Sequence, residues 1–592
     1  MTTTTPRPPD TREHPTTGGA PPATDPPWTT TCIYAHLTTP GTDALIRDCV
    51  APLAQELVAQ GRATGWFFLR YWHGGPHVRV RFRDPDPAAV DGFEAAVAAW
   101  LADHAEDRVD LDPGRFHARF SQPDPVPWHG HGQIVREPYL PEVDRYGGPR
   151  ALARCEEFFE LSSRIAGAVL RTGDRTKVFA VGLDLMTLAM GAASPAALDA
   201  ARSARRYFSS WDFVDEASSD RDGALQQAEG LRRDWSEVWD KRVAAVTAAV
   251  QDSPGSTHGL WRRGIEDLLA DLDRISAQDG LTRPPAAILW SLIHMMNNRL
   301  GISVHEERVL SWLASAMTLG WTSVADYFED TPHALDRAYL EGSKYAVRTH
   351  AAAQWPRPPS GAAGQERPGG FPSVPLPAPT PLRHQLDEVL RDRRSSYGDY
   401  GGTLDLPVLA TVLGWAAGEV ESRAVQWGDT RIVPRTHPSP GGRYATSVLV
   451  NAWTVTGIDP GLYAYAATGH SLVRLGPALT RDTVQHASPT FGSGQDRAAN
   501  GPPVVLTDTV PAVLLLASDI TSLRPKYGLR ALRLLLQECG HLAQNLLLCA
   551  TAAGCRSIPV SAFSDDELST AVHLDGIDGF VSALLPLGPA PD

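Results

Sequence analysis

The sequence predicts an α+β protein of two domains joined by a Pro-rich linker, and three observations support this prediction. The chain has 592 residues, whereas a single domain usually stops growing near ~250 to 300 residues. Residues 354–383 are rich in Pro and Gly and contain almost no periodic apolar residues, which is typical of an extended spacer. Strand and helix patterns occur on both sides of this spacer, so each side can form a mixed domain.

We therefore expect four segments: a disordered tail (1–27), a first domain (28–348), a linker (349–384) and a second domain (385–592). The tail lacks the apolar region of a signal peptide, and the apolar runs elsewhere are too short to span a bilayer. We expect a cytoplasmic protein that binds no membrane. The net charge of −14 argues against nucleic-acid binding. The six cysteines form no C-x-x-C pair, so neither a zinc site nor a disulfide framework is indicated, and we expect no metal.

The first domain begins with strand patterns and continues with helix patterns. Alternating apolar residues predict strands, and apolar residues three and four positions apart predict helices. The strands are predicted at 31–37, 66–72 and 77–82, and the clearest helices at 149–170, 197–208 and 269–276.

The predicted strand 77–82 carries a row of cationic residues. Because successive side chains of a strand point to opposite faces, His77, Arg79 and Arg81 share one face while the apolar residues face the core. Two guanidinium groups can bind a carboxylate, a phosphate or a developing enolate, because their donors are planar, charged and bidentate. The alternative is an ordinary solvent-exposed strand face.

Three segments of this domain resemble one family, in the order in which that family has them. They are WFFLRYWHGGPHVRVRF (66–82), LPEVDRYGG (140–148) and SLIHMMNNRLG (291–301). They resemble the glutamate-elimination domain of lantibiotic dehydratases and its stand-alone relatives in thiopeptide biosynthesis. The resemblance implies that a Ser or Thr of a ribosomal precursor peptide, glutamylated from glutamyl-tRNA by another enzyme, loses glutamate and becomes a dehydroamino acid.

The resemblance also implies roles for individual residues. Arg79, Arg81 and His294 carry the elimination, and Arg145 is the further arginine. Arginines can stabilise the charge that develops on the amide oxygen and on the departing carboxylate. An imidazole suits proton transfer, although the sequence leaves the identity of the base open. The neighbours of His294 are expected to orient it; they are Asn297, Asn298 and Arg299.

Two other functions are compatible with the same fold. Pyridine synthases of thiopeptide pathways resemble this domain and join two dehydroalanines, and fold alone does not settle function. A domain that only docks the peptide is the third possibility. Retention of Arg79, Arg81 and His294 favours elimination over both.

The second domain combines helices and strands around three polar segments. A helix is predicted at 384–392, strands at 445–455 and 461–467, and a long apolar helix at about 528–552. Arg393, Arg394 and Ser395 follow the first helix, where charge and several donors can converge on a phosphate. The turn at Ser439 and Gly441 allows a backbone to approach a flat ligand. The long helix carries a polar stripe, for which the alternative is a solvent-exposed side; its members are Arg530, Arg533, Gln537 or Glu538, His541, and Gln544 or Asn545.

These segments resemble the FMN-dependent nitroreductase superfamily, and KYG (526–528) resembles the azoline oxidases within it. The resemblance implies that Lys526 and Tyr527 are catalytic. It implies that FMN is bound by Arg393, Arg394, Ser395, Ser439, Gly441 and Gln544. Many relatives have an arginine where this chain has Tyr397. A general nitro or flavin reductase is the competing interpretation.

The whole chain resembles fused elimination and azoline-dehydrogenase proteins of lactazole-like thiopeptide pathways. The resemblance implies a ribosomal precursor peptide as substrate, and a glutamylating enzyme and a cyclodehydratase as functional partners. Because the superfamily commonly builds its flavin site between two subunits, it also implies a homodimer through the FMN domain.

Overall fold

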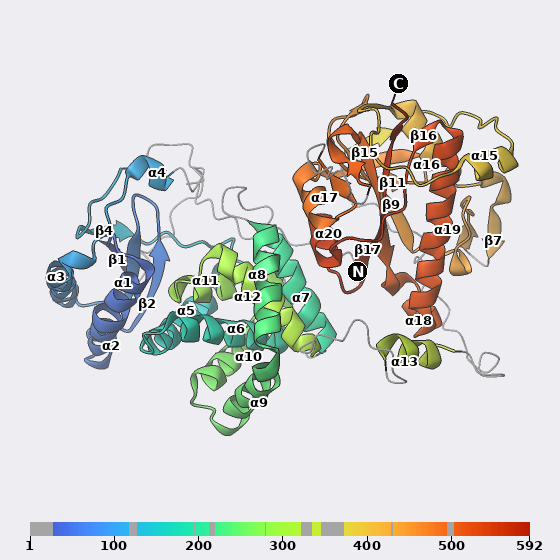
Figure 1. Ribbon diagram of the computed structural model, residues 1–592. Helices are drawn as coiled ribbons and strands as arrows, with labels where there is room; N and C mark the ends of the chain where they lie inside the picture. The colour runs from blue at the N-terminus through green and yellow to red at the C-terminus, as the bar shows by residue number, and fades with distance from the viewer. Residues whose placement is uncertain are drawn as a thin grey trace. The chain divides into compact units, whose positions relative to one another are not determined.

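The structure is a computed structural model, and it describes residues 28–117, 127–194, 196–211, 220–278, 280–320, 334–344, 372–427, 430–493 and 503–591. The chain forms two compact units, Met1–Ala325 and Asp326–Asp592, which are shown in Figure 1. The predicted disordered tail (1–27) and residues 349–371 of the predicted linker lie outside the described residues.

The first unit begins with an antiparallel sheet. Its described strands are ordered β2-β3-β1-β4, and their bounds are β1 Trp28–Tyr34, β2 Gly65–Tyr71, β3 His77–Arg83 and β4 Ile134–Pro138. The helices of this part are α1 Thr39–Leu45, α2 Ala51–Ala59, α3 Pro87–Asp103 and α4 Pro113–His117. Phe82 of β3 and Phe93 of α3 pack edge to face with ring centroids 5.0 Å apart, so the apolar face of β3 lies against α3. The predicted alternation of this strand is confirmed.

The rest of the first unit is helical. Its helices are α5 Pro149–Leu170, α6 Arg175–Ala193, α7 Ala197–Ser210, α8 Arg221–Asp234, α9 Ser236–Asp252, α10 Thr257–Ser276, α11 Pro285–Arg299 and α12 Val304–Leu319. Two of them close the edge of the sheet at β2. Phe68 N donates to Ser163 Oγ of α5 at 3.1 Å, and the amide of Asn298 of α11 binds both Arg70 N and Arg70 O. These bonds hold α5 and α11 against the sheet.

Helix α6 is long and apolar enough to cross a membrane by length and composition alone. In this fold it packs against α7, α10 and α12. It also carries Asp184, which is 2% exposed and binds Arg242 and His258. A buried, paired carboxylate in the middle of the helix fits a core helix.

The second unit is built on a seven-stranded sheet in its described part, ordered β16-β17-β15-β9-β11-β12-β5. The strands are β5 Ser373–Pro375, β6 Leu404–Asp405, β7 Val425–Trp427, β8 Thr430–Ile432, β9 Thr446–Ala452, β10 Val455–Thr456, β11 Gly461–Ala466, β12 Ser471–Gly476, β13 Phe491–Gly492, β14 Val505–Leu506, β15 Ala512–Asp519, β16 Cys555–Arg556 and β17 Gly579–Pro589. The helices are α13 Leu335–Gly342, α15 Leu386–Asp392, α16 Leu406–Ala417, α17 Arg481–Ala487, α18 Arg524–Tyr527, α19 Arg530–Ala552 and α20 Asp565–Ala571. One apolar cluster joins the sheet to α16 and α19, and another joins it to α17 and α20. Both units mix helices and strands, so the predicted α+β class is confirmed.

Two predicted boundaries need correction. Helix α13 lies before the predicted boundary at residue 348, yet it belongs to the second unit, because Tyr339 binds the start of α19. The end of the predicted linker is not a spacer. Strand β5 pairs with β12, and Trp415 Nε1 donates to Thr380 O at 2.9 Å. Pro-rich composition here marks an edge strand, where missing N–H donors are tolerated.

Candidate active sites in the two domains

The cationic face of β3 is largely buried. Arg79 is 8% exposed and His77 is 4% exposed, so the alternative of a solvent-exposed strand face does not hold. The guanidinium of Arg79 lies 3.9 Å above the ring of Tyr71 and 3.6 Å from Glu137 of β4. These contacts come from the two strands β2 and β4, which hold the charged end of Arg79 in one place.

His77 positions Arg79 rather than adding a third charge. Its Nδ1 lies 2.8 Å from Gly75 O, and its Nε2 accepts a hydrogen bond from Arg79 Nε at 3.1 Å. This arrangement requires the neutral ring with the proton on Nδ1. Burial, opposed by the bond to Gly75 and reinforced by the charge of Arg79, lowers the pKa of His77 to about 3. The ring is therefore neutral at physiological pH.

Arg81 lies next to a second, fully buried arginine. Its guanidinium is 4.6 Å from the ring of Tyr139. Arg299 of α11 is 1% exposed, and its Nε donates to Ser163 Oγ at 3.1 Å. Burial lowers the pKa of Arg299 to about 9, against the opposite effect of Tyr146, and the charge of Arg81 lowers it further. The two arginines thus place positive charge between the sheet and α11.

Arg145 lies in the loop before α5 and is also buried. Its Nη1 donates to Glu142 at 2.8 Å, and its guanidinium lies 5.7 Å from the ring of Tyr146. Nε and Nη2 of Arg145 are buried and have no hydrogen-bond partner among the described residues. A buried guanidinium with two unused donors is suited to bind an anion.

His294 is held by an acid rather than by its neighbours on α11. Its Nδ1 lies 3.0 Å from Oε2 of Glu307, which is fully buried in α12. The hydroxyl of Tyr207 of α7 donates to the other oxygen of Glu307. Because the carboxylate accepts from Nδ1, the lone pair of His294 is left on Nε2.

The expectation that Asn297, Asn298 and Arg299 orient His294 is therefore wrong. Asn298 binds the edge of β2 and Arg299 binds Ser163. Sequence reasoning also missed Glu307 and Tyr207, since each lies on a different helix and neither belongs to the motif around His294.

Three of the four predicted residues of this domain, Arg81, Arg145 and His294, are linked through buried partners, whereas Arg79 contacts Tyr71, His77 and Glu137. The charge of Arg81 acts on Arg299, Arg299 on Tyr146, and Tyr146 on Arg145. Arg145 also acts on Tyr207, which binds Glu307 and so reaches His294. The structure therefore assembles these three residues into one array between the sheet and the helices.

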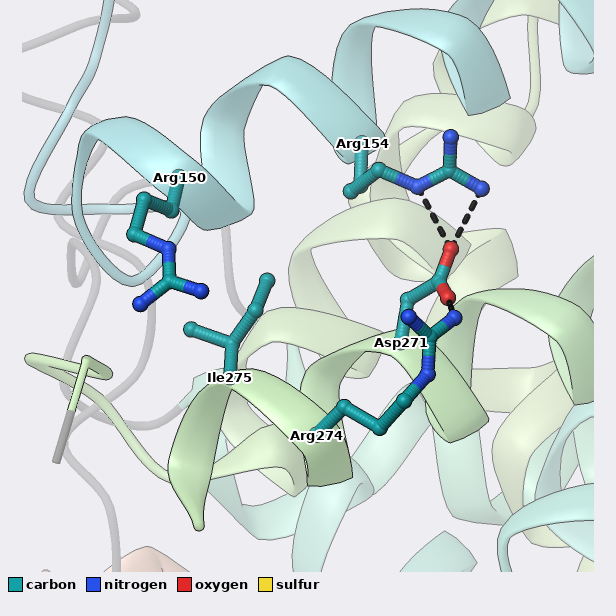
Figure 2. A pocket seen from close by; sticks show the side chains of 5 residues that line it. All are labelled: Arg150, Arg154, Asp271, Arg274 and Ile275. Atoms are coloured by element: carbon teal, nitrogen blue, oxygen red, sulfur yellow. Dashed lines mark hydrogen bonds and ion pairs between the residues drawn. The ribbon is translucent and has the colours of Figure 1, made fainter. Parts of the chain in front are cut away.

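A cavity of about 470 Å³ elsewhere in this domain is lined by arginines, as Figure 2 shows. Arg154 of α5 and Arg274 of α10 both bind Asp271, which is 6% exposed. Arg150 binds Gln278. Arg150 and Arg154 of α5 thus bind Gln278, which follows α10, and Asp271 of α10. The network therefore ties α5 to α10.

In the second domain, the turn at Ser439 is fixed by an acid of α19. Ser439 Oγ donates to Glu538 at 2.6 Å and accepts from Tyr444 N at 2.7 Å. The other oxygen of Glu538 accepts from Thr446 N at 2.7 Å. Burial raises the pKa of Glu538, although these hydrogen bonds oppose the shift. Glu538 thus holds both ends of the turn. The predicted polar stripe included Gln537 or Glu538, but the sequence did not predict this contact.

The same turn lies against the predicted catalytic pair. Gly441 has φ +63°, and a Cβ there would lie 2.6 Å from Tyr527 Oη and 3.0 Å from Lys526 Nζ. The nitrogen of Lys526 is 5.2 Å from the centre of the Tyr527 ring. Only glycine allows this close approach at this φ. The structure therefore brings Gly441, Lys526 and Tyr527 together.

The remaining predicted flavin residues lie elsewhere on the domain. Ser396 N, directly after Ser395, donates to Ser557 O just beyond β16, past the end of α19. Arg393 is half-buried and Arg394 exposed, and within the described residues neither side chain has a recorded hydrogen bond or ion pair. Helix α19 has 23 residues and spans about 34 Å, with α18 before its start and α15 toward its other end (Figure 1). Gln544 is exposed along α19.

Part of each unit matches the model of a known family. Residues 28–318 match the family model for the lantibiotic biosynthesis dehydratase C-terminus, and residues 462–589 match the nitroreductase family. The protein named "Putative nitroreductase MJ1384", from Methanocaldococcus jannaschii, is 29% identical over 204 residues, which are 34% of this chain and 90% of that protein.

Solved structures show weaker likeness. The pyridine synthase TbtD from thiomuracin biosynthesis is 19% identical, with a TM-score of 0.42 over 50% of this chain and 98% of that chain. The tRNA-dependent lantibiotic dehydratase MibB from Microbispora sp. 107891 is 20% identical, with a TM-score of 0.34 over 50% of this chain and 28% of that chain. With TM-scores below 0.5, neither structure carries an argument about activity.

Proposed function

Because the chain joins a lantibiotic dehydratase C-terminal domain to a nitroreductase domain, we propose that it is a bifunctional enzyme that modifies a ribosomal precursor peptide. The first domain eliminates glutamate from glutamylated Ser or Thr to give dehydroamino acids. The second oxidises azolines to azoles with FMN. The observation that carries the first activity is the array of buried partners that links Arg81, Arg145 and His294, with Arg79 held on the same strand as Arg81.

The elimination follows from the chemistry of this array. Removal of the α-proton and cleavage of the Cβ–O bond form the Cα–Cβ double bond and release glutamate as an anion. Nε2 of His294 has the free lone pair for a proton, since Glu307 accepts from Nδ1. Arg79 and Arg81 stabilise the charge that builds on the substrate, because they are positioned before the reaction begins. The unused buried donors of Arg145 fit a carboxylate of the leaving glutamate.

The oxidation rests on the contact between the Ser439–Gly441 turn and the pair Lys526 and Tyr527. An azoline becomes an azole by losing a hydride and a proton, and bound FMN supplies the hydride acceptor. Lys526 takes the proton and Tyr527 assists it, since both lie against the turn that approaches the flat ligand.

The residues present fit FMN in two respects. Gly441, which has no side chain, lets the turn lie directly against Lys526 and Tyr527, and the side chains of Arg393 and Arg394 have no recorded partner among the described residues. With Ser395, Ser439 and Gln544, these residues would hold the cofactor. Because the two groups lie toward opposite ends of α19, we propose a homodimer in which one copy supplies the arginines and the other the turn.

The proposed substrate also defines partners and location. A glutamylating enzyme must supply the ester that the first domain cleaves, and a cyclodehydratase must supply the azoline that the second oxidises. Both activities and this protein would act on one peptide in the cytoplasm.

The decisive experiment is incubation of the protein with FMN and a precursor peptide that bears one glutamylated Ser and one azoline. Mass spectrometry separates the two activities, since elimination removes glutamate and oxidation removes two hydrogens. Formation of a pyridine ring from two dehydroalanines would replace elimination by the synthase function. Reduction of nitro compounds with an intact azoline would identify the second domain as a general reductase.

A further inference from the structure

Helix α13 contacts the oxidase domain at the segment that follows the predicted catalytic pair. Tyr339 and Ser343 are four residues apart and therefore share one face of this helix. The hydroxyl of Tyr339 donates to Leu529 O at 3.1 Å and accepts from Arg533 N at 3.0 Å. A single hydroxyl thus bridges two backbone groups at the start of α19.

This bridge binds both groups of the first helical turn. Leu529 is the N-cap of α19 and Arg533 is its fourth helical residue, so their carbonyl and amide belong to the first i to i−4 pair of the helix. The hydroxyl of Tyr339 contacts both of them. The first turn of α19 is consequently held by a side chain from another helix.

Two arginines of the same turn hold α13 in place. Arg530 donates to Ser343 O at 3.2 Å, and Arg533 donates to Ser343 Oγ at 3.3 Å. Ser343 is the C-cap of α13 and is 3% exposed. Cations at the C-terminus of a helix bind its last carbonyl groups and favour the helix dipole. The part of the polar stripe at Arg530 and Arg533 therefore binds α13.

The held turn is directly connected to Lys526 and Tyr527. Both belong to α18, whose final residue is followed by Gly528 at φ +54° and then by Leu529. Ala531 N donates to Gly528 O at 3.1 Å. A shift of Leu529 would therefore be passed through one residue to Tyr527 and to its contact with Gly441.

We propose that Tyr339 is a positioning residue for the Lys526–Tyr527 pair. This inference rests on the proposed azoline oxidation. The hydroxyl fixes the start of α19, and the start of α19 fixes the turn at Gly528. The turn at Gly528 in turn sets where the side chains of Lys526 and Tyr527 meet the Ser439–Gly441 turn. The oxidase domain accordingly includes residues 335–344, which precede the Pro-rich segment.

The test is Tyr339→Phe in the full-length protein, which removes the hydroxyl and keeps the ring. A matched control is Tyr463→Phe, because Tyr463 also donates its hydroxyl to a backbone carbonyl, that of Asp459, in the same domain. We expect kcat for azoline oxidation to fall about 10-fold, and up to ~10²-fold, in Tyr339→Phe only. KM for the peptide, FMN content and glutamate elimination should stay at the parent values, which a general loss of folding would not allow.

Hydrogen exchange provides a readout that does not depend on azoline chemistry. Peptides covering 523–533 should exchange faster in Tyr339→Phe than in the parent and in Tyr463→Phe, while peptides from β9 and β15 should not change. Equal exchange at 523–533 in all three proteins overturns the inference. A parent protein that leaves azolines intact refutes the proposed oxidation instead, and unchanged kcat in Tyr339→Phe with an active parent refutes the positioning role.

Discussion

The two candidate sites differ in how much of each is assembled within one chain. In the first domain, Arg81, Arg145 and His294 are joined by buried partners from three helices and the loop before α5. In the second, Lys526 and Tyr527 meet the Ser439–Gly441 turn near the start of α19, while Arg393 and Arg394 lie toward its other end. Motifs that are equally clear in the sequence thus belong to one site whose residues are joined within a single chain and to another site whose residues lie apart. Folding of one chain completes the first array and prepares only parts of the second.

This difference has a physical basis in the ligands. Elimination needs positive charge that is already oriented when the substrate arrives, and buried arginines keep their orientation only if protein groups bind them. A flavin brings its own phosphate and ring, so the residues that bind it can remain without protein partners until it arrives.

The largest expected effect tests the second site. Replacing Lys526 by Ala should lower the rate of azoline oxidation by about 10² to 10⁴, because a general base usually contributes that much. The variant should still bind FMN and should eliminate glutamate at the parent rate. Arg524→Ala is the control, since Arg524 is exposed on the same short helix. Absorbance of the purified protein and the mass of the peptide are the measurements.

Each other outcome for Lys526→Ala would change the comparison. A colourless variant would assign the lysine to cofactor binding, so that the second site would be more complete within one chain than we propose. A fully active variant would remove Lys526 from the chemistry.

The next effect tests the first site. Arg81→Ala should slow glutamate elimination by about 10² to 10³, the usual loss for one preorganised donor, and should leave azoline oxidation unchanged. Arg136→Ala is the matched control, because this arginine lies on β4 with a half-exposed side chain and binds Asp91 and Glu94. Quantifying the glutamylated peptide over time measures the effect. Equal rates in both variants would exclude Arg81 from the chemistry.

The sequence predicts much of the fold and less of the sites. Periodicity predicted α5 and the strands β2 and β3 nearly to the residue, because their apolar faces are long and regular, but it placed both ends of β1 three residues too late (31–37 against Trp28–Tyr34). It placed α13 in the wrong domain, since the contact of Tyr339 with α19 joins residues that are about 190 positions apart. The sequence analysis also placed β5 in a linker, because three extended residues among prolines show no periodic pattern of apolar side chains.

The same limit applies to the sites. Motifs indicated His294 and Ser439 but not Glu307, which holds His294. The polar stripe included Gln537 or Glu538, but it did not predict that Glu538 holds Ser439. Each acid lies inside an apolar helix and is recognisable as a partner only when the two elements are packed together. A sequence motif therefore predicts the reacting groups more readily than the groups that orient them.

A third, smaller effect separates orientation from reaction in the first site. Glu307→Gln keeps the shape of the side chain but removes the charge that accepts from His294 Nδ1. We expect elimination to slow by about 10- to 10²-fold, which is typical when a partner that orients a histidine is lost. Glu266→Gln, at an exposed pair with Arg262 on α10, should have no effect. Single-turnover elimination by quenched flow measures both, and a loss as large as that of Arg81→Ala would give Glu307 a direct role.

The smallest expected effect concerns stability in acid. It tests whether a buried, neutral histidine makes each of the two domains less stable at low pH, although their sites differ. Burial lowers the pKa of His77 to about 3 and that of His437 to about 4, and in both cases a neighbouring arginine lowers it further. An unfolded histidine titrates near ~6.5. Between these values the unfolded chain binds more protons than the folded one, so the free energy of unfolding decreases as the pH falls below ~6.5 and is independent of these groups above it. The decrease is at most about 1.4 kcal/mol per pH unit for each histidine.

Hydrogen exchange of β3 and β9 at pH 5.5 and 6.5, corrected for the intrinsic rates, reports the two domains separately. His77→Gln should flatten the pH dependence at β3 alone, and His437→Gln should flatten it at β9 alone. A dependence that survives both substitutions would place the acid sensitivity in other groups, and one that vanishes from both strands after a single substitution would mean that the two domains unfold together.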